Sequence, residues 1–370
     1  MTSRSYCDLS AVRVLTCAGV AVRFDYAVTF RLVYLMCLAL AGASPCARCR
    51  AEDAPWSSAP DVWPVPLNAS SGVISALGHS QDGRHLALGL SSGEVVVMGA
   101  SDGQVVRRWP AHAERINALV FTAEDRRLIT ASDDGTLKMW TVETGAEERT
   151  FSGHTGWVTA ISASAAGQVF ASGSYDRSIR VWSQQTDPKA SFELSGHQAG
   201  VKDVDFRRDG KQIVTASADK TAIVWNLETR QPVLTIKGHQ GILRASKFSP
   251  DGLQIATASE DGSVRLWNSQ TGERGHALVG HAGMVWSLAY APTGNLLASG
   301  GFDQTTRLWN PQGGKRVAVL RGPKTPICGL AFSPDGETLF VAGQEQNVYR
   351  YRARREENPA AGTAETETKP

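Results

Sequence analysis

The chain has 370 residues, of which 42% are hydrophobic and 20% are charged, and its formal net charge is only +2. This balance provides neither a large basic field nor an acidic tract, so we expect no nucleic-acid partner. The 36 glycines suit a protein built from short strands and tight turns.

Residues 1–51 have features of a leader that carries a signal peptide. Residues 32–43 are uncharged and mostly apolar, and they follow Arg31, as in the apolar segment of a secretory signal. This segment is too short to span a bilayer, which takes about 20 residues. We therefore expect an exported protein, periplasmic or extracellular, with no transmembrane helix in the mature chain. Because residues 1–30 are long for a signal and contain Asp8 and Asp25, a cytoplasmic protein with a disordered extension remains the alternative.

The cysteines give no evidence of a cofactor or metal. Five of the six lie in the first 50 residues, and only Cys328 lies beyond them. Cys46 and Cys49 form a C-x-x-C pair, but no second pair completes a zinc site and no His follows to mark haem attachment. Residues 52–60 are polar and Pro-rich, which predicts a linker.

A repeat of about 42 residues occupies most of the remaining chain. Five tryptophans are separated by 42, 43, 42 and 42 residues, and each is preceded by His at 28 positions, by Thr or Ser at 10 and by Asp at 6. The five sets are His112, Thr130, Asp134 and Trp140; His154, Ser172, Asp176 and Trp182; His197, Thr215, Asp219 and Trp225; His239, Thr257, Asp261 and Trp267; and His281, Ser299, Asp303 and Trp309. One further step of 42 in each direction reaches Met98 and Tyr351, which makes seven units.

Within each unit the hydrophobic pattern has a period of two, which indicates strands. In residues 243–267, for example, three such runs are separated by the turns Ser249-Pro250-Asp251-Gly252 and Glu260-Asp261-Gly262, and a fourth run starts at Ala277. Four short antiparallel strands in about 42 residues correspond to one blade of a propeller.

The dipeptides Gly153-His154 and Gly238-His239 near the start of a unit, and Trp225-Asn226 and Trp267-Asn268 at its end, carry a resemblance to a known family. Residues 61–352 resemble the WD-repeat β-propeller family. The resemblance implies an all-β fold, a seven-bladed β-propeller of four-stranded antiparallel blades. It also implies a buried hydrogen-bond chain in each complete blade, from Trp through Ser or Thr and His to Asp.

A propeller must join its last blade to its first, because an open ring exposes a strand edge. The seventh unit supplies only three strands, and residues 61–67 provide the missing fourth at the other end of the chain. We expect this N-terminal strand to pair with residues 348–351. Pro64 and Pro66 favour an outermost position, where missing N–H donors are tolerated. Residues 353–370 lack a strand pattern and predict a disordered tail.

Ser172, Asp176 and His154 have the residue types of a hydrolytic triad. Because the same set recurs five times together with Trp, we interpret it as structural and expect no catalysis. An enzyme of propeller fold, such as a lactonase or a quinone-dependent dehydrogenase, needs carboxylates, Asn or metal ligands clustered at the channel. We find no such cluster, and a screen for bound calcium or quinone would identify an enzyme of this kind.

The remaining hypothesis is a non-catalytic scaffold that binds a protein or peptide on one propeller face, monomeric by itself within a larger complex. A cytoplasmic signalling scaffold is the alternative of the same kind. In the family that the chain resembles, residues three after the His and one before the Asp surround the channel on the narrow face. Among those positions the candidate binding residues are Arg115, Trp157, Tyr175, Ile242, Met284 and Phe302.

Overall fold

The computed structural model describes residues 56–66, 72–122, 124–184 and 192–354. These residues form seven four-stranded antiparallel sheets arranged in a ring, and they contain no helix. The predicted fold class, a seven-bladed β-propeller, is therefore confirmed. The predicted leader, residues 1–51, and residues 355–370 of the predicted tail lie outside the described residues.

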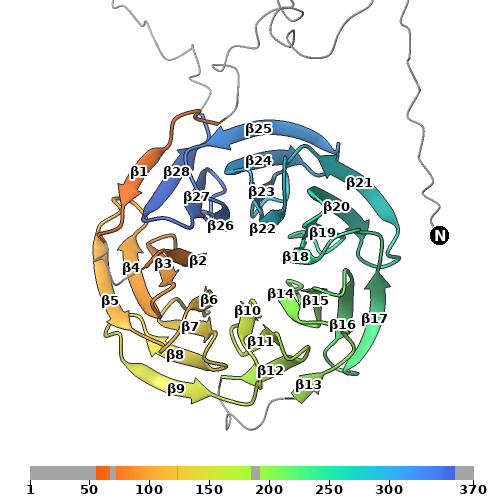
Figure 1. The fold of residues 1–370 in the computed structure, drawn as a ribbon, viewed down its shortest axis with the longest axis horizontal. Helices are drawn as coiled ribbons and strands as arrows, with labels where there is room; N and C mark the ends of the chain where they lie inside the picture. The colour runs from red at the N-terminus through yellow and green to blue at the C-terminus, as the bar shows by residue number, and fades with distance from the viewer. Residues whose placement is uncertain (1–55, 67–71, 123, 185–191, 355–370) are drawn as a thin grey trace, which may run out of the picture. The chain divides into compact units, whose positions relative to one another are not determined.

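Each of the first six blades takes four consecutive strands, numbered from the axis outward (Figure 1). Blade 1 contains β2 (Ile74–His79), β3 (His85–Leu90), β4 (Glu94–Gly99) and β5 (Val105–Pro110). Blade 2 contains β6 (Ile116–Phe121), β7 (Arg127–Ser132), β8 (Leu137–Thr141) and β9 (Glu147–Phe151). Blade 3 contains β10 (Val158–Ala163), β11 (Val169–Ser174), β12 (Ile179–Ser183) and β13 (Phe192–Leu194).

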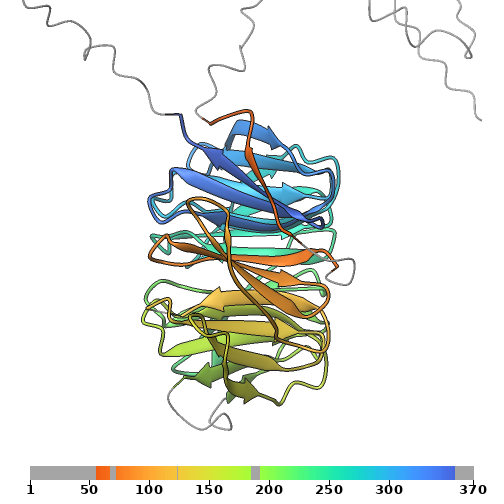
Figure 2. The same ribbon diagram turned by 90° about the vertical axis from the view of Figure 1, so that its left-hand side faces the viewer.

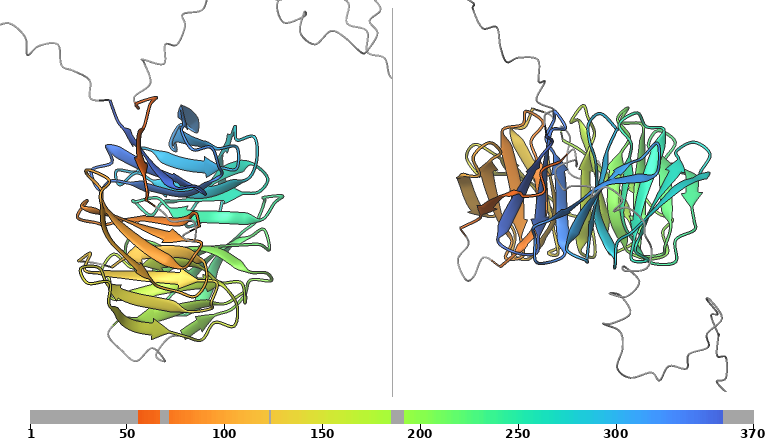
Figure 3. Two further views of the ribbon diagram at one scale, coloured as in Figure 1. Left: turned by 60° about the vertical axis from the view of Figure 1, so that its left-hand side comes forward. Right: turned by 90° about the horizontal axis from the view of Figure 1, so that it is seen from above.

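The next three blades repeat this order. Blade 4 contains β14 (Val201–Phe206), β15 (Gln212–Ser217), β16 (Ala222–Asn226) and β17 (Gln231–Ile236). Blade 5 contains β18 (Leu243–Phe248), β19 (Gln254–Ser259), β20 (Ser263–Asn268) and β21 (Arg274–Val279). Blade 6 contains β22 (Val285–Tyr290), β23 (Leu297–Gly301), β24 (Thr305–Asn310) and β25 (Lys315–Arg321). Seen from the side, these strands run between the two faces of the ring, so the connecting loops lie on those faces (Figures 2 and 3).

Blade 7 is built from both ends of the propeller. It contains β26 (Ile327–Phe332), β27 (Thr338–Gly343) and β28 (Asn347–Arg352), and its outermost strand is β1 (Asp61–Pro64). The strands β1 and β28 are antiparallel, with Asp61 opposite Arg350. The predicted closure by an N-terminal strand is confirmed, although the strand ends at Pro64 rather than at residue 67.

Ordered packing begins before the predicted start of the propeller at residue 61. Trp56, in the predicted linker, is only 2% exposed and forms a β-bridge with Ala353, the first residue of the predicted tail. Its ring meets Phe332 edge-on, at 5.9 Å between centroids. Burial of a large aromatic side chain supplies enough stabilisation to fix a segment whose polar, Pro-rich composition indicates a linker.

The hydrophobic core lies between neighbouring blades. One cluster joins Trp109 of blade 1 to Ile116 and Phe121 of blade 2, and another joins Phe340 of blade 7 to Met98 of blade 1. The facing sheets approach closely because the residue after each Ser or Thr position is small. These residues are Gly89, Ala131, Gly173, Ala216, Ala258, Gly300 and Ala342.

Close approach makes glycine necessary where it occurs at these positions, as Gly173 shows. A Cβ atom added to Gly173 would lie 2.5 Å from Cγ1 of Val201 in blade 4. Such a contact is far inside van der Waals distance, so the facing sheet would have to move.

The innermost strand of every blade has a β-bulge at its second residue. In β14, for example, the pairing passes from Val201 to Asp203 and leaves Lys202 unpaired. The seven bulge residues are Ser75, Asn117, Thr159, Lys202, Arg244, Trp286 and Cys328. Because a bulge redirects a side chain, this irregularity decides which residues face the channel.

Candidate functional site: buried tetrads and the channel mouth

Four side chains in each of blades 2 to 6 form a hydrogen-bonded tetrad. In blade 3, Nε1 of Trp182 donates to Oγ of Ser172 at 2.9 Å. The imidazole of His154 contacts the same oxygen through Nε2 at 2.8 Å and contacts Asp176 through Nδ1 at 2.9 Å. The structure thus brings together four residues that are spread over 29 positions of the sequence.

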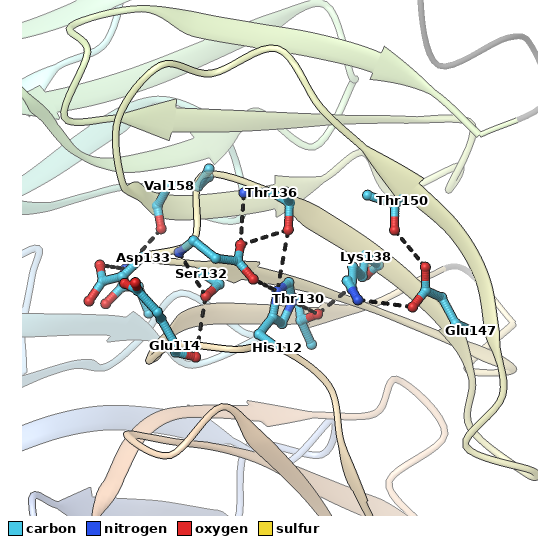
Figure 4. A network of polar contacts seen from close by, with 12 residues as sticks. His112, Glu114, Thr130, Ser132, Asp133, Thr136, Lys138, Glu147, Thr150 and Val158 are labelled. Carbon is cyan, nitrogen blue, oxygen red and sulfur yellow. Dashed lines mark hydrogen bonds and ion pairs between the residues drawn. The ribbon is translucent and has the colours of Figure 1, made fainter.

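The other four tetrads repeat this geometry, with corresponding distances between 2.7 and 3.0 Å. Figure 4 shows the network of blade 2, in which His112 bonds to Thr130. In blades 1 and 7 apolar residues occupy two of the tetrad positions. Met98 and Tyr351 replace Trp, while Leu88 and Val341 replace Thr or Ser, and all four are fully buried.

The electrostatics of the tetrad favour a neutral imidazole beside an ionised carboxylate. Burial alone would raise the pKa of Asp176, but hydrogen bonds from Ser178, Thr155 and His154 lower this pKa to about 2. Burial lowers the pKa of His154 below its usual value, and the hydrogen bond to Asp176 only partly offsets that effect.

These protonation states give every polar side-chain atom of the blade 3 tetrad a hydrogen-bond partner. Nδ1 of His154 carries the proton and donates it to Asp176, which leaves Nε2 as an acceptor for the hydroxyl of Ser172. The same hydroxyl oxygen accepts the indole N–H of Trp182. Complete pairing is what makes buried polar groups tolerable, so the network stabilises the blade.

The central channel opens on one face into a cavity of about 310 Å³. All seven bulge residues line this mouth, together with Arg115, Asp133, Trp157, Tyr175 and Gln344. The mouth therefore takes one side chain from the innermost strand of every blade, and its chemistry varies around the ring.

Four of the bulge residues act as clamps between blades. Each donates to the backbone carbonyl just before the next bulge residue: Ser75 to Ile116, Asn117 to Val158, Thr159 to Val201 and Cys328 to Ile74. Within the described chain, Lys202, Arg244 and Trp286 make no such bond. These three side chains line the mouth along an arc that spans blades 4 to 6.

Cations and aromatic rings are stacked along this arc. Nζ of Lys202 lies 4.1 Å from the ring centroid of Tyr175. In the next blade, the guanidinium of Arg244 lies 5.6 Å from the Trp286 ring, and Nε of Arg244 donates to Glu260 at 2.8 Å. Such stacking holds long cationic side chains in place while their outer N–H groups stay available.

Comparison with protein families gives six matches to the WD domain, G-beta repeat family. They cover residues 103–141, 145–183, 188–226, 230–268, 272–310 and 314–351, more than half of the chain. The chain belongs to the WD-repeat family. No curated protein matches it. The first matched repeat starts after β4, so strands β2 to β4 of blade 1 lie outside the matches.

WD-repeat propellers are generally non-enzymatic scaffolds and commonly bind proteins. In the described part of this WD-repeat chain no helix is long and apolar enough to cross a membrane. No group of three or more His, Cys, Asp or Glu side chains in the same ranges is placed to hold a metal ion.

The burial of the Ser-His-Asp sets of this WD-repeat protein supports a structural role. Ser172 is 0% exposed, as is the side chain of His154. A hydrolytic serine must meet its substrate, but the hydroxyl of Ser172 is enclosed and already bonded to Trp182 and His154.

The six candidate binding residues of the WD-repeat propeller lie on loops at one face. Arg115, Trp157 and Tyr175 line the mouth. Ile242, Met284 and Phe302 lie outside this lining, on the loops that flank the first two strands of blades 5 and 6. Backbone hydrogen bonds set the two kinds of loop side by side, as from Tyr175 N to Trp157 O at 2.9 Å and from Phe302 N to Met284 O at 2.8 Å.

Sequence reasoning missed the bulge residues of the WD repeats. Lys202, Arg244 and Trp286 lie five positions after the His of their unit, two beyond the position that we selected. The fixed offset could have identified them, but only with knowledge that a bulge turns that residue toward the axis.

We expect the His154→Ala variant of this WD-repeat chain to lose roughly 1–3 kcal/mol of unfolding free energy, because Ser172 and Asp176 lose a buried partner. Urea unfolding followed by circular dichroism measures the loss. His276→Ala, which removes an exposed imidazole on β21, is the control and should change stability by less than about 0.5 kcal/mol. Equal stability of the two variants would contradict a stabilising tetrad.

Proposed function

We propose that the face around the channel mouth binds a protein or peptide and that the propeller acts as a non-catalytic scaffold. The observation that carries this proposal is the clustering of exposed apolar side chains on this one face. Trp157, Tyr175, Met284 and Phe302 are 52%, 51%, 37% and 49% exposed. Water-exposed aromatic rings held in place by a rigid scaffold are typical of binding surfaces.

The other large exposed apolar residues of the described ranges lie away from the loops at the mouth. Val62, Val106, Val233 and Val279 are on outermost strands, and Leu253 is on a turn. Single exposed aliphatic residues are common on any protein surface. The rim of the mouth, formed by Trp157, Tyr175, Met284 and Phe302, differs because its aromatic rings pack against other rings. The ring centroids are 5.4 Å apart for Trp157 and Tyr175 and 5.6 Å apart for Trp286 and Phe302.

The scaffold is suited to this role because the rim rests on five complete tetrads. Each tetrad ties the loop that carries the His to the turn that carries the Asp, and the rim residues lie on those same loops. A preorganised surface loses little entropy on binding, which favours affinity.

The test is affinity purification from the native host with the full tagged chain. The double variant Trp157→Ala and Phe302→Ala should keep the melting temperature of the parent and lose the partners that the parent retains. Val279→Ala, which truncates a 72% exposed side chain on the outer strand β21, is the matched control and should retain them. Retention of the same partners by the double variant would exclude this face.

A further inference from the structure

The charges at the mouth are unequal. Three cationic side chains, Arg115, Lys202 and Arg244, lie at or beside the cavity with two carboxylates, Asp133 and Glu260. One positive charge is therefore left without a partner. Because two of the cations are bulge residues of neighbouring blades, the surplus lies on one side of the mouth, along blades 4 and 5.

The carboxylates at the mouth are already engaged, whereas several N–H groups are not. Asp133 accepts from Nδ2 of Asn117 at 2.7 Å, and Glu260 accepts from Arg244. By contrast, Nε of Arg115 and Nε1 of Trp286 are enclosed and have no hydrogen-bond partner among the described residues. An incoming ligand cannot reach these enclosed donors, so the feature of the mouth that favours an acceptor is the surplus positive charge of Lys202 and Arg244 in its lining.

The ammonium group of Lys202 also lacks an anionic partner among the described residues. Its Nζ lies over the ring of Tyr175 and forms no ion pair within the described ranges. Burial, and then the neighbouring charge of Arg244, lower the pKa of Lys202. A bound anion would offset both the burial of the Lys202 ammonium and its repulsion by Arg244, because an opposite charge between the two cations stabilises both of them.

The size of the cavity and the aromatic residues around it indicate which kind of molecule carries the anionic group. A space of about 310 Å³ is at the small end of ligand pockets and admits one or two side chains rather than a folded domain. The rings of Trp157 and Tyr175, in blade 3, lie on one side of Lys202 and Arg244, and those of Trp286 and Phe302, in blade 6, lie on the other. A peptide lying across the mouth would therefore meet apolar surface on both sides of its central residue.

We propose that the channel mouth binds the carboxylate of a Glu or Asp in an extended peptide whose neighbouring residues are apolar. The carboxylate lies between Lys202 and Arg244, and the flanking side chains lie on the two aromatic pairs. This inference rests on the proposed function and specifies the partner's chemistry. A single surplus charge, with Asp133 in the lining, favours a carboxylate over a phosphate group, which carries almost two negative charges.

The test uses nine-residue peptides with apolar flanks that differ only in the central residue, which is Glu, Gln, Lys or phosphoserine. Binding to the full chain is measured by fluorescence anisotropy. We expect the Glu peptides to bind at least about tenfold more tightly than the Gln peptides. Lys202→Gln and Arg244→Gln should each remove most of that difference, whereas Lys211→Gln, on the turn at the far end of β14, should preserve it.

A charge-reversal variant distinguishes loss of a specific charge contact from loss of binding through misfolding. Lys202→Glu should transfer the preference to the Lys peptides while the melting temperature stays at the parent value. Equal binding of Glu and Gln peptides, or stronger binding of phosphoserine peptides, would overturn the inference and leave the proposed function standing. Failure of all the peptides to bind, together with an unchanged partner set for the double rim variant, would overturn both.

Discussion

Removal of the chain up to residue 67 should lower the melting temperature of the propeller by roughly 10 °C or more. The truncation deletes β1, so that β28 loses its outer neighbour and Arg350 loses both its ion pair with Asp61 and its contact with the Trp63 ring. It also deletes Trp56 and Val65, which are buried in two hydrophobic clusters. Loss of one buried Trp alone costs about 3–5 kcal/mol.

A shorter truncation provides the control for ring closure. Removal of residues 1–51 keeps Trp56 and β1, and it should leave the melting curve of the propeller unchanged. Differential scanning calorimetry of the two truncated chains beside the parent measures the difference. If both truncated chains melt together, the N-terminal strand contributes nothing to closure.

Acidification should unfold the propeller steeply between about pH 4 and pH 2. In Asp134, Asp176, Asp219, Asp261 and Asp303, burial tends to raise the pKa, but hydrogen bonds within the same blade lower it overall. A carboxyl whose pKa is lower in the folded state stabilises that state above its unfolded pKa of about 4, and this stabilisation is lost as the pH falls toward the folded value.

The histidines act in the same direction at higher pH. Burial lowers the pKa of His154, His239 and His281, so that the unfolded chain takes up protons below about pH 6.5 before the folded chain does. Stability therefore starts to fall in that range. Burial raises the pKa of Asp205, which acts in the opposite direction, but one such group does not offset five aspartates.

Asp176→Asn isolates one of these contributions. The variant should be less stable than the parent by about 2 kcal/mol at pH 7, and the difference should shrink toward zero near pH 2. Urea unfolding at a series of pH values measures both quantities. Asp209→Asn, on the exposed turn after β14, is the control and should show no such convergence. A difference that is independent of pH would show that Asp176 does not act through its charge.

The spacing of residues in the sequence predicted the ring and its closure by an N-terminal strand, but it did not predict that Trp56, before that strand, packs against blade 7. Tryptophans at a constant interval require structurally equivalent units, and the incomplete seventh unit required a strand from elsewhere in the chain. Trp56 was missed because the residues around it are polar and Pro-rich. Its burial depends on Phe332, a partner whose proximity exists only after closure.

The candidate site was predictable only in part, because some of its residues face the channel through local backbone geometry that the sequence does not reveal. Trp157, Tyr175 and Phe302 follow from their offsets to the His and Asp of each unit. Lys202 and Trp286 face the channel because of a bulge, and hydrophobic periodicity does not indicate which residue a bulge leaves unpaired. Which bulge residues clamp neighbouring blades likewise follows from three-dimensional distances and not from residue type alone.

The construction of blade 7 from both ends has a consequence for synthesis. The partner of β1 is separated from it by 289 residues, from Asp61 to Arg350, so the ribosome makes almost the whole propeller before the last sheet can be completed. Until then the nascent polypeptide presents unfinished apolar edges at blades 1 and 7. Blade 7 can therefore be completed only after β28 has been made, and a chaperone that shields those edges until then would raise the yield of folded protein.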